Sequence, residues 1–353
     1  MINNNFFILI GESGLIVWDY DAHRQYELSE KYATRLIEIL YGNKGVDLQN
    51  SIDRDYVGLK VFSLSKRSVT PDWGWDILSR IFHQGTRNIP SDNTPDSEQA
   101  WAECYIAHCD EVWRRPSPYE NHTRYKGKGI SLKSIQAVTG LEEVLERRQT
   151  VRNFLDQAVD LEVVTKLLHY TLGFLASRRA CENSGLPANL SYRRASPSGG
   201  GLNATEGYLY ANNITGLERG IYYYDPYHHT LHLHEGTLPE LGSLLSGQHF
   251  ANDLPMGIFL CSRFDKLWWK YPHSRAYRMA LIEVGHVAQT FQLAATDQGL
   301  QTWLTGAINE DRVDPLLRVA SSPESVLFFV GAGHSCGSIT PASLVNILIE
   351  PRT

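Results

Sequence analysis

The alternation of apolar and polar residues predicts short strands and amphipathic helices from the beginning of the chain. Apolar runs at 6–10 and 15–20 are separated by two glycines, which is the pattern of a β-hairpin. Ser29 then precedes apolar residues at helical spacing, and this helix is expected to end near Gly42. Further helices are predicted at 73–82 and 98–113.

The second half of the chain has the pattern of helices and strands that is typical of an α+β fold. Helices are expected at 140–147 and 161–174, and a long one at 274–297. Its predicted buried stripe consists of Ala280, Val284, Val287, Ala288, Phe291 and Ala295. Apolar runs predict strands at 207–210, 220–224, 230–234, 256–261 and 326–330.

The segment 115–129 is the best candidate for a linker between domains. It contains two prolines and two glycines among polar and basic residues. We therefore expect an N-terminal extension over 1–115, a linker over 116–135 and a main domain over 136–353. A strand–strand–helix arrangement at the start also suits a small winged-helix-like unit that binds a peptide or a partner, or a structural cap.

Composition narrows the classes of function. A length of 353 residues suggests about two domains, and a chain that is 42% hydrophobic can form a large core. The net charge of −6 argues against a protein that coats nucleic acid. The chain has neither a long apolar run for a membrane span nor the pattern of a signal peptide, so a cytoplasmic location is expected. Five scattered cysteines do not suggest a disulfide framework.

Two common cofactor motifs are rejected on spacing. Gly331 and Gly333 follow a predicted strand, but Cys336 stands where a dinucleotide-binding motif needs its third glycine. Too few residues follow for the helix and strand of a βαβ unit. Cys104 and Cys109 lack a second ligand pair of zinc-type spacing, so no metal site is predicted.

Three clusters could carry chemistry. Arg148, Thr150 and Arg152 alternate, so an extended backbone would point all three the same way, toward a polyanionic or polar cofactor. The glycine-rich run 196–201 would let backbone amides approach a ligand. Lys270 and Tyr271 follow two tryptophans and could form an acid–base pair, since desolvation lowers the pKa of a lysine. Each cluster also suits a plain alternative: a solvated basic turn, a flexible turn, and a surface lysine beside a packed tyrosine.

Taken in order, these clusters resemble the SagB/ThcOx-type dehydrogenases of the nitroreductase superfamily. The matching pieces are RRQTVRNF, RRASPSGGG, GIYYYDPYHHTLHLH and KYPHSRAYRMALIEVGHVAQTFQLAATDQGL, with WGWDILSRIFHQGTR upstream. The resemblance implies an α+β flavin fold, in which helices flank a central antiparallel sheet and FMN lies at a homodimer interface. It also implies oxidation of peptide-borne thiazoline or oxazoline rings to thiazoles or oxazoles.

The resemblance assigns roles residue by residue. Lys270 and Tyr271 match the catalytic pair of azoline dehydrogenases. The positions implied to bind FMN are Arg148, Gln149, Thr150, Arg152, Pro197, Ser198, Gly199, Gly200 and Gly306. Gln149 stands where many nitroreductases have His or Arg. Arg275, Glu283, Gly285 and Gln289 match the helix that follows the catalytic pair.

The implied partners are an azoline-containing peptide and a cyclodehydratase, with neither nucleic acid nor membrane involved. Removing two hydrogens from an azoline needs a base for the one that leaves as a proton, which Lys270 would supply. Three alternatives stay open. The chain could oxidise or desaturate another peptide or carrier-bound intermediate, reduce nitro compounds with a nicotinamide, or serve as a scaffold without catalysis.

Overall fold

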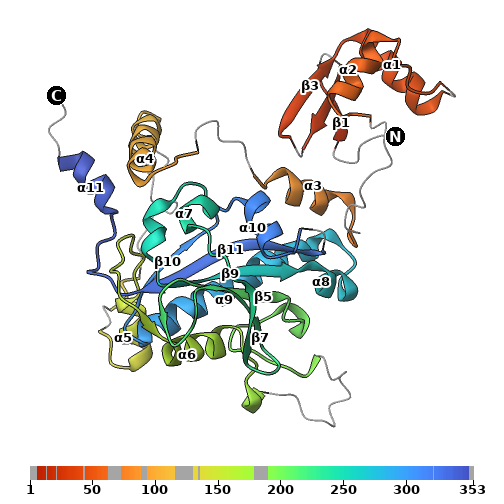
Figure 1. The fold of residues 1–353 in the computed structure, drawn as a ribbon. Helices are drawn as coiled ribbons and strands as arrows, with labels where there is room; N and C mark the ends of the chain where they lie inside the picture. The colour runs from red at the N-terminus through yellow and green to blue at the C-terminus, as the bar shows by residue number, and fades with distance from the viewer. Residues whose placement is uncertain are drawn as a thin grey trace.

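The computed structural model describes residues 6–12, 14–20, 22–42, 44–62, 73–88, 94–115, 130–133, 136–178, 190–320 and 322–349. The predicted linker therefore falls largely outside the described residues. The chain begins with an antiparallel sheet in the order β1-β2-β3, formed by β1 (Phe6–Ile10), β2 (Leu15–Asp19) and β3 (Arg24–Leu28). Helices α1 (Glu30–Tyr41) and α2 (Ser51–Gly58) follow (Figure 1).

This N-terminal unit has a core of its own. Val17, Leu36, Tyr56 and Phe62 are buried together. Asp53 is fully buried, and Arg35 neutralises it through two hydrogen bonds, at 2.7 and 2.5 Å. The predicted hairpin and first helix are confirmed. Strand β3 was not predicted, because its sequence RQYEL lacks an apolar alternation.

A six-stranded sheet forms the main body, with every neighbouring pair antiparallel and the order β10-β11-β9-β5-β7-β8. Its strands are β5 (Thr205–Ala211), β7 (Gly220–Asp225), β8 (Thr230–Glu235), β9 (Met256–Arg263), β10 (Gln301–Thr305) and β11 (Glu324–Gly333). The predicted α+β class with an antiparallel sheet is confirmed. A separate short parallel pair joins β4 (Val159–Asp160) to β6 (Ile214–Thr215).

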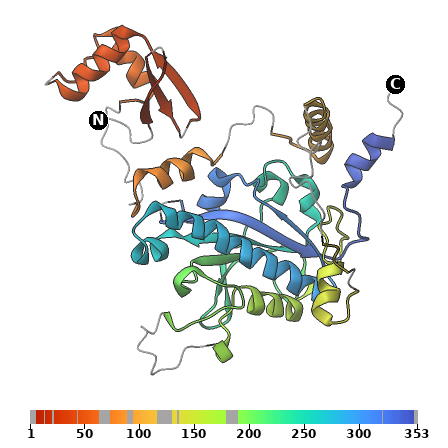
Figure 2. The same ribbon diagram turned by 180° about the vertical axis from the view of Figure 1, so that it is seen from behind.

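Helices cover both faces of this sheet (Figures 1 and 2). On one face lie α6 (Leu161–Thr171) and α9 (Tyr277–Asp297), whose buried stripe is the predicted one. The other face carries α7 (Leu241–Leu244) and α10 (Glu310–Leu316). The buried alternation along β5 explains both cores, because Leu209 joins the first core whereas Tyr208 and Tyr210 join the second.

The remaining helices lie around this body. They are α3 (Ile77–Gly85), α4 (Glu98–Trp113), α5 (Gly140–Arg147), α8 (Phe264–Lys270) and α11 (Ala342–Ile349). Helix α4 contacts α11, and Trp101 of α4 packs on Phe250 on the face of the sheet that carries α7 and α10. Short 3-10 turns complete the chain at Ala176–Arg178, Gly199–Gly201, His249–Asp253 and Ser274–Ala276.

The glycines of β11 have a packing role, in agreement with the rejected dinucleotide motif. A side chain at Gly331 would meet Leu254 at 2.7 Å, and one at Gly333 would meet Pro255 at 2.6 Å. Both glycines lie inside an antiparallel strand, so no phosphate-binding turn forms there.

Candidate functional site

The segment 148–152 leaves α5 in an extended conformation and runs beside β10. Val151 is buried and donates its amide to the Thr302 carbonyl at 3.0 Å. Arg148 Nη1 lies 3.3 Å from Thr150 Oγ1 and 3.4 Å from Gln292 Oε1 on α9. Arg152 Nη1 donates to the Ile339 carbonyl at 3.2 Å. Among the described residues neither arginine has an acidic partner, so both can still bind an anion.

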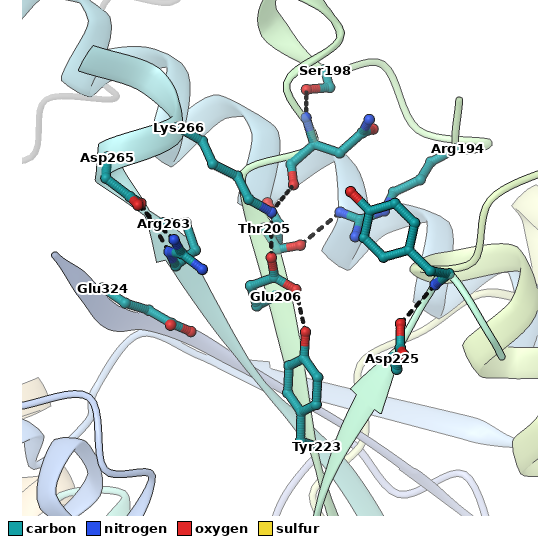
Figure 3. Close-up of polar contacts among 12 residues, drawn as sticks. Arg194, Ser198, Thr205, Glu206, Tyr223, Asp225, Arg263, Asp265, Lys266 and Glu324 are labelled. Carbon is teal, nitrogen blue, oxygen red and sulfur yellow. Dashed lines mark hydrogen bonds and ion pairs between the residues drawn. The ribbon is translucent and has the colours of Figure 1, made fainter. Parts of the chain in front are cut away.

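The glycine-rich loop is held against the first half of α9 by one buried carboxylate. Glu283, 3% exposed, accepts from Ser198 Oγ at 2.6 Å and from the amide and hydroxyl of Thr205 at 2.9 and 3.1 Å. Ser198 Oγ in turn accepts the Asn203 amide at 2.8 Å (Figure 3). Gly200 has φ +63°, a left-handed conformation that favours glycine.

Lys270 and Tyr271 lie against this loop, at the end of α8. Lys270 Nζ donates to the Gly200 carbonyl at 3.1 Å. A Cβ at Gly200 would clash with the Tyr271 hydroxyl and lie 2.9 Å from Lys270 Nζ. The structure thus brings together two sets of predicted residues that are 70 positions apart in the sequence. In the single chain the Lys270 side chain is exposed.

The two sets implied to bind FMN occupy different parts of α9. The loop is tied to Glu283 and the arginine segment to Gln292. Nine residues of helix correspond to ~14 Å and about two and a half turns, so these anchors lie on opposite sides of the helix. Gln149 accompanies the arginines, with Nε2 3.4 Å from Gln301 Oε1.

Gly306 lies elsewhere, just after β10. Its position is 3.4 Å from the Phe328 ring, measured from an ideal Cβ, and it lines a cavity of about 450 Å³ with Asn88, Ser246 and Glu310. The described contacts do not join it to either of the other two sets.

The structure adds a support for the Lys270–Tyr271 turn that the sequence did not indicate. Trp75 Nε1 donates to the Tyr271 carbonyl at 2.7 Å, and Asp76 accepts the Ser274 amide at 3.2 Å. Hydrogen bonding by Ser274 lowers the pKa of Asp76. Asp76 also caps α3, so the helix and the turn are fixed by one carboxylate. The sequence signals for this segment were its helical period and the resemblance of WGWDILSRIFHQGTR to the family, and neither revealed this contact.

A second polar cluster lies at the other face of the sheet (Figure 3). Glu206 pairs with Lys266 at 2.5 Å and accepts from Tyr223 at 3.2 Å. Arg263 pairs with Asp265. Glu324 has no ion-pair partner among the described residues and accepts from Tyr208 at 3.3 Å. Burial, reinforced by the nearby Glu206 carboxylate, raises the pKa of Glu324 to about 7.

Two other features are absent from the described residues. Within the described residues, no three His, Cys, Asp or Glu side chains gather in a way that could hold a metal ion. Likewise, none of the described helices combines the length and apolar character needed to cross a bilayer.

Comparison with known proteins places the fold in a family. The model of the nitroreductase family matches residues 145–334, which is more than half of the chain. The protein MJ1384 of Methanocaldococcus jannaschii, named as a nitroreductase, is 27% identical over 196 residues, covering 55% of this chain and 91% of that protein. The match confirms the predicted resemblance to the nitroreductase superfamily.

Two further similarities involve proteins named for peptide products. The trifolitoxin-processing protein TfxB of Rhizobium leguminosarum bv. trifolii is 28% identical over 180 residues, which is 49% of this chain but only 47% of that protein. The solved E. coli microcin synthetase McbBCD complex with truncated pro-MccB17 bound gives a TM-score of 0.44 at 21% identity, covering 65% of this chain and 82% of the matched chain.

Proposed function

Because the chain belongs to the nitroreductase family, we propose that it is an FMN-dependent dehydrogenase that oxidises azoline rings of a peptide to azoles. The observation that carries this proposal is the contact of Lys270 with the Gly200 carbonyl, which places the proposed base beside the proposed flavin loop. Similarity to a trifolitoxin-processing protein supports a peptide substrate.

We call the arginine segment 148–152 and the glycine-rich loop 197–200 the two half-sites, or the arginine half and the loop half. Their hydrogen-bond donors fit FMN. Arg148 and Arg152 offer unpaired cations for the phosphate, and Thr150 and Gln149 offer neutral donors for the ribityl chain. The loop 197–200 offers a surface without bulky side chains, with its backbone turned by Gly200 and Gly201. When bound, FMN supplies the acceptor for the hydride that leaves the azoline.

The chain itself must remove the accompanying proton. Lys270 Nζ, exposed beside Gly200, takes that proton, and the Tyr271 hydroxyl on the same turn assists by hydrogen bonding. Trp75 and Asp76 fix the turn, so the base keeps its position relative to the loop. Substrate or a second chain would cover Lys270 and exclude water from it.

The placement of the two half-sites supports a homodimer. Between them runs an exposed stripe on α9 that includes Leu281, 42% exposed, Ile282, 46% exposed, and Gly285. A second copy packed on this stripe would bring the arginine segment of one chain to the loop of the other. Gly285→Arg is expected to give monomers that no longer bind FMN, measured by sedimentation and flavin absorbance.

The N-terminal extension, over 1–115, is proposed to recognise the peptide or a partner cyclodehydratase, joined to the main domain at 136–353 through 116–135. Its edge strand β1 exposes Ile8, Leu9 and Ile10, at 46%, 41% and 91%. An edge strand with exposed apolar side chains suits the addition of a peptide strand.

The test is turnover of an azoline peptide by Lys270→Ala. The variant is expected to keep FMN and lose about 10²–10⁴-fold in kcat, the range of general base catalysis. Lys166→Ala is the matched control, since Lys166 is an exposed lysine on α6 paired only with Glu162. Wild-type turnover by Lys270→Ala would contradict the base assignment. A protein that takes up no FMN would contradict the dehydrogenase.

A further inference from the structure

Three arginines to which no role has been assigned so far line a cavity beside the glycine-rich loop. The cavity has a volume of about 330 Å³ and is bounded by Arg178, Arg193 and Arg194 on one side and by the loop from Ala195 to Ser198 on the other. Arg178 is exposed, Arg193 is half-buried and Arg194 is only 4% exposed. Positive charge therefore extends from the surface to the interior.

All three guanidinium groups donate to neutral carbonyls. Arg178 Nη1 lies 3.3 Å from the carbonyls of Arg194 and Ala195. Arg193 Nη1 donates to Leu190 and, at 2.8 Å, to Tyr192. Within the part of the chain that the structure describes, no Asp or Glu pairs with any of them. The nearby carboxylate of Glu283 is already occupied by Ser198 and Thr205.

Arg194 is the most informative of the three. Its Nη1 donates to the Thr205 carbonyl at 2.6 Å, as Figure 3 shows, and its guanidinium carbon lies 5.2 Å from the centroid of the Phe174 ring. Its Nε is buried without a hydrogen-bond partner. A buried cation with an unsatisfied N–H is costly, so a native site of this kind calls for a missing partner. The free Nε edge has the geometry that a carboxylate or phosphate fills with two parallel bonds.

We propose that Arg178, Arg193 and Arg194 form an oxyanion pocket that takes a carboxylate of the peptide substrate. The class of ligand rests on charge and cavity alone, whereas its source in a peptide rests on the proposed function. The pocket backs onto the same loop whose Gly200 carbonyl holds Lys270. An acidic residue of the peptide near the reacting ring would thus bind to the arginines on one side of the glycine-rich loop, while the ring lies on the other side.

The pocket can be tested by binding, without any turnover. The probe is inorganic phosphate at constant ionic strength, added to the full-length protein and followed by thermal shift and calorimetry. Arg178→Gln combined with Arg193→Gln is expected to weaken phosphate binding about tenfold or more, since bonds to charged groups carry most of the affinity. Arg219→Gln is the control, because Arg219 is an exposed arginine that donates to one neutral amide, Asn212. Equal weakening in the control would overturn the pocket.

Competition then identifies the source of the oxyanion. A blocked Gly-Asp-Gly peptide is expected to displace phosphate, whereas the Gly-Asn-Gly peptide is not. Displacement by both peptides, or by neither, would overturn the assignment to a substrate carboxylate. Displacement by FMN but not by riboflavin would assign the pocket to the cofactor phosphate and would likewise overturn it. Because these are binding measurements, an enzyme that oxidises no azoline could still pass them, so the two proposals fail separately.

Arg194 needs a gentler change because it is buried. Arg194→Lys keeps the charge but removes the fork, and it is expected to keep the fold while losing phosphate affinity. Unchanged affinity in a folded Arg194→Lys protein would contradict the role given to its Nε.

Discussion

The two half-sites on α9 are built in opposite ways. In the loop half, the polar groups already have partners within the chain. Glu283 of α9 accepts three hydrogen bonds of 2.6, 2.9 and 3.1 Å from Ser198 and Thr205. The arginine half is loosely tied, with contacts of 3.3 and 3.4 Å from Arg148 to neutral oxygens. In the proposed FMN site, the loop half would be preorganised for the ring, whereas the arginine half would keep its side-chain donors free for the phosphate.

Removing the carboxylate that organises the loop should have the largest effect. Glu283→Ala leaves the Ser198 hydroxyl and both donors of Thr205 unsatisfied in a buried position. The free energy of unfolding is expected to fall by about 3–5 kcal/mol, measured by urea denaturation. Glu283→Gln retains one acceptor oxygen, which can still serve the two donors of Thr205, and is the control, with a smaller loss. Equal stability of Glu283→Ala and the wild type would show that the loop is held by other contacts.

Glu324 sharpens this comparison, because it is a half-buried glutamate that accepts only one long hydrogen bond among the described residues, from the Tyr208 hydroxyl at 3.3 Å. Its folded pKa of about 7 exceeds the value near 4.3 of an unfolded chain, so the folded protein favours the protonated form. The resulting penalty is absent below pH ~4, grows as the pH rises toward about 7, and is constant above. Glu324→Gln should therefore stabilise the protein by up to about 4 kcal/mol at pH ~8, the free energy that separates a pKa of about 7 from one near 4.3.

The same substitution should leave stability nearly unchanged at pH ~4, where both forms of the protein are neutral at this position. Thermal unfolding of the variant and the wild type across this range measures the difference. A gap that does not widen between acid and neutral pH would contradict the account of Glu324.

The arginine half should respond in affinity rather than in stability. Arg148→Ala removes only long contacts, so the fold is expected to persist, while FMN binds about tenfold more weakly, as for one lost charged hydrogen bond. Fluorescence titration with FMN measures this change. Arg147→Ala, one position earlier and exposed, is the control. A large loss of stability in Arg148→Ala would mean that the Arg148 side chain stabilises the fold even without a ligand, as Glu283 does in the loop half.

The smallest effect is expected from a change at the contact between the glycine-rich loop and the proposed base, Lys270. Gly200→Ala places a left-handed alanine in the turn at a cost of about 1 kcal/mol, and its methyl group displaces the Tyr271 hydroxyl. Turnover is expected to fall, and the FMN content of the variant shows how far the loss is due to weaker cofactor binding. Gly140→Ala, with no atom near its Cβ, is the control. Full turnover by Gly200→Ala would show that the loop does not position the proposed catalytic pair.

The sequence predicted those helices and strands whose apolar residues recur with a regular helical or strand spacing. The buried stripe of α9 and the strands β7 and β8 follow local alternation, so they could be predicted. Strand β10 was missed because QTWLT is short and mixed in polarity, although it supports the arginine segment. The contacts of Trp75 with Tyr271 and of Asp76 with Ser274 join positions nearly 200 residues apart, and no local pattern encodes such pairs.

The contribution of α3 to this turn also limits how the protein can be divided. Trp73 and Trp75 pack on Phe264, Trp268 and Tyr277, and His83, buried among them, has its pKa lowered to about 3 by burial. The family match begins only at residue 145. A fragment cut at that boundary would leave a bare aromatic surface beneath the turn that carries Lys270. The smallest transplantable module of this protein therefore begins before Trp73, and a domain exchange made at the family boundary would transfer the sheet without the support of the Lys270–Tyr271 turn.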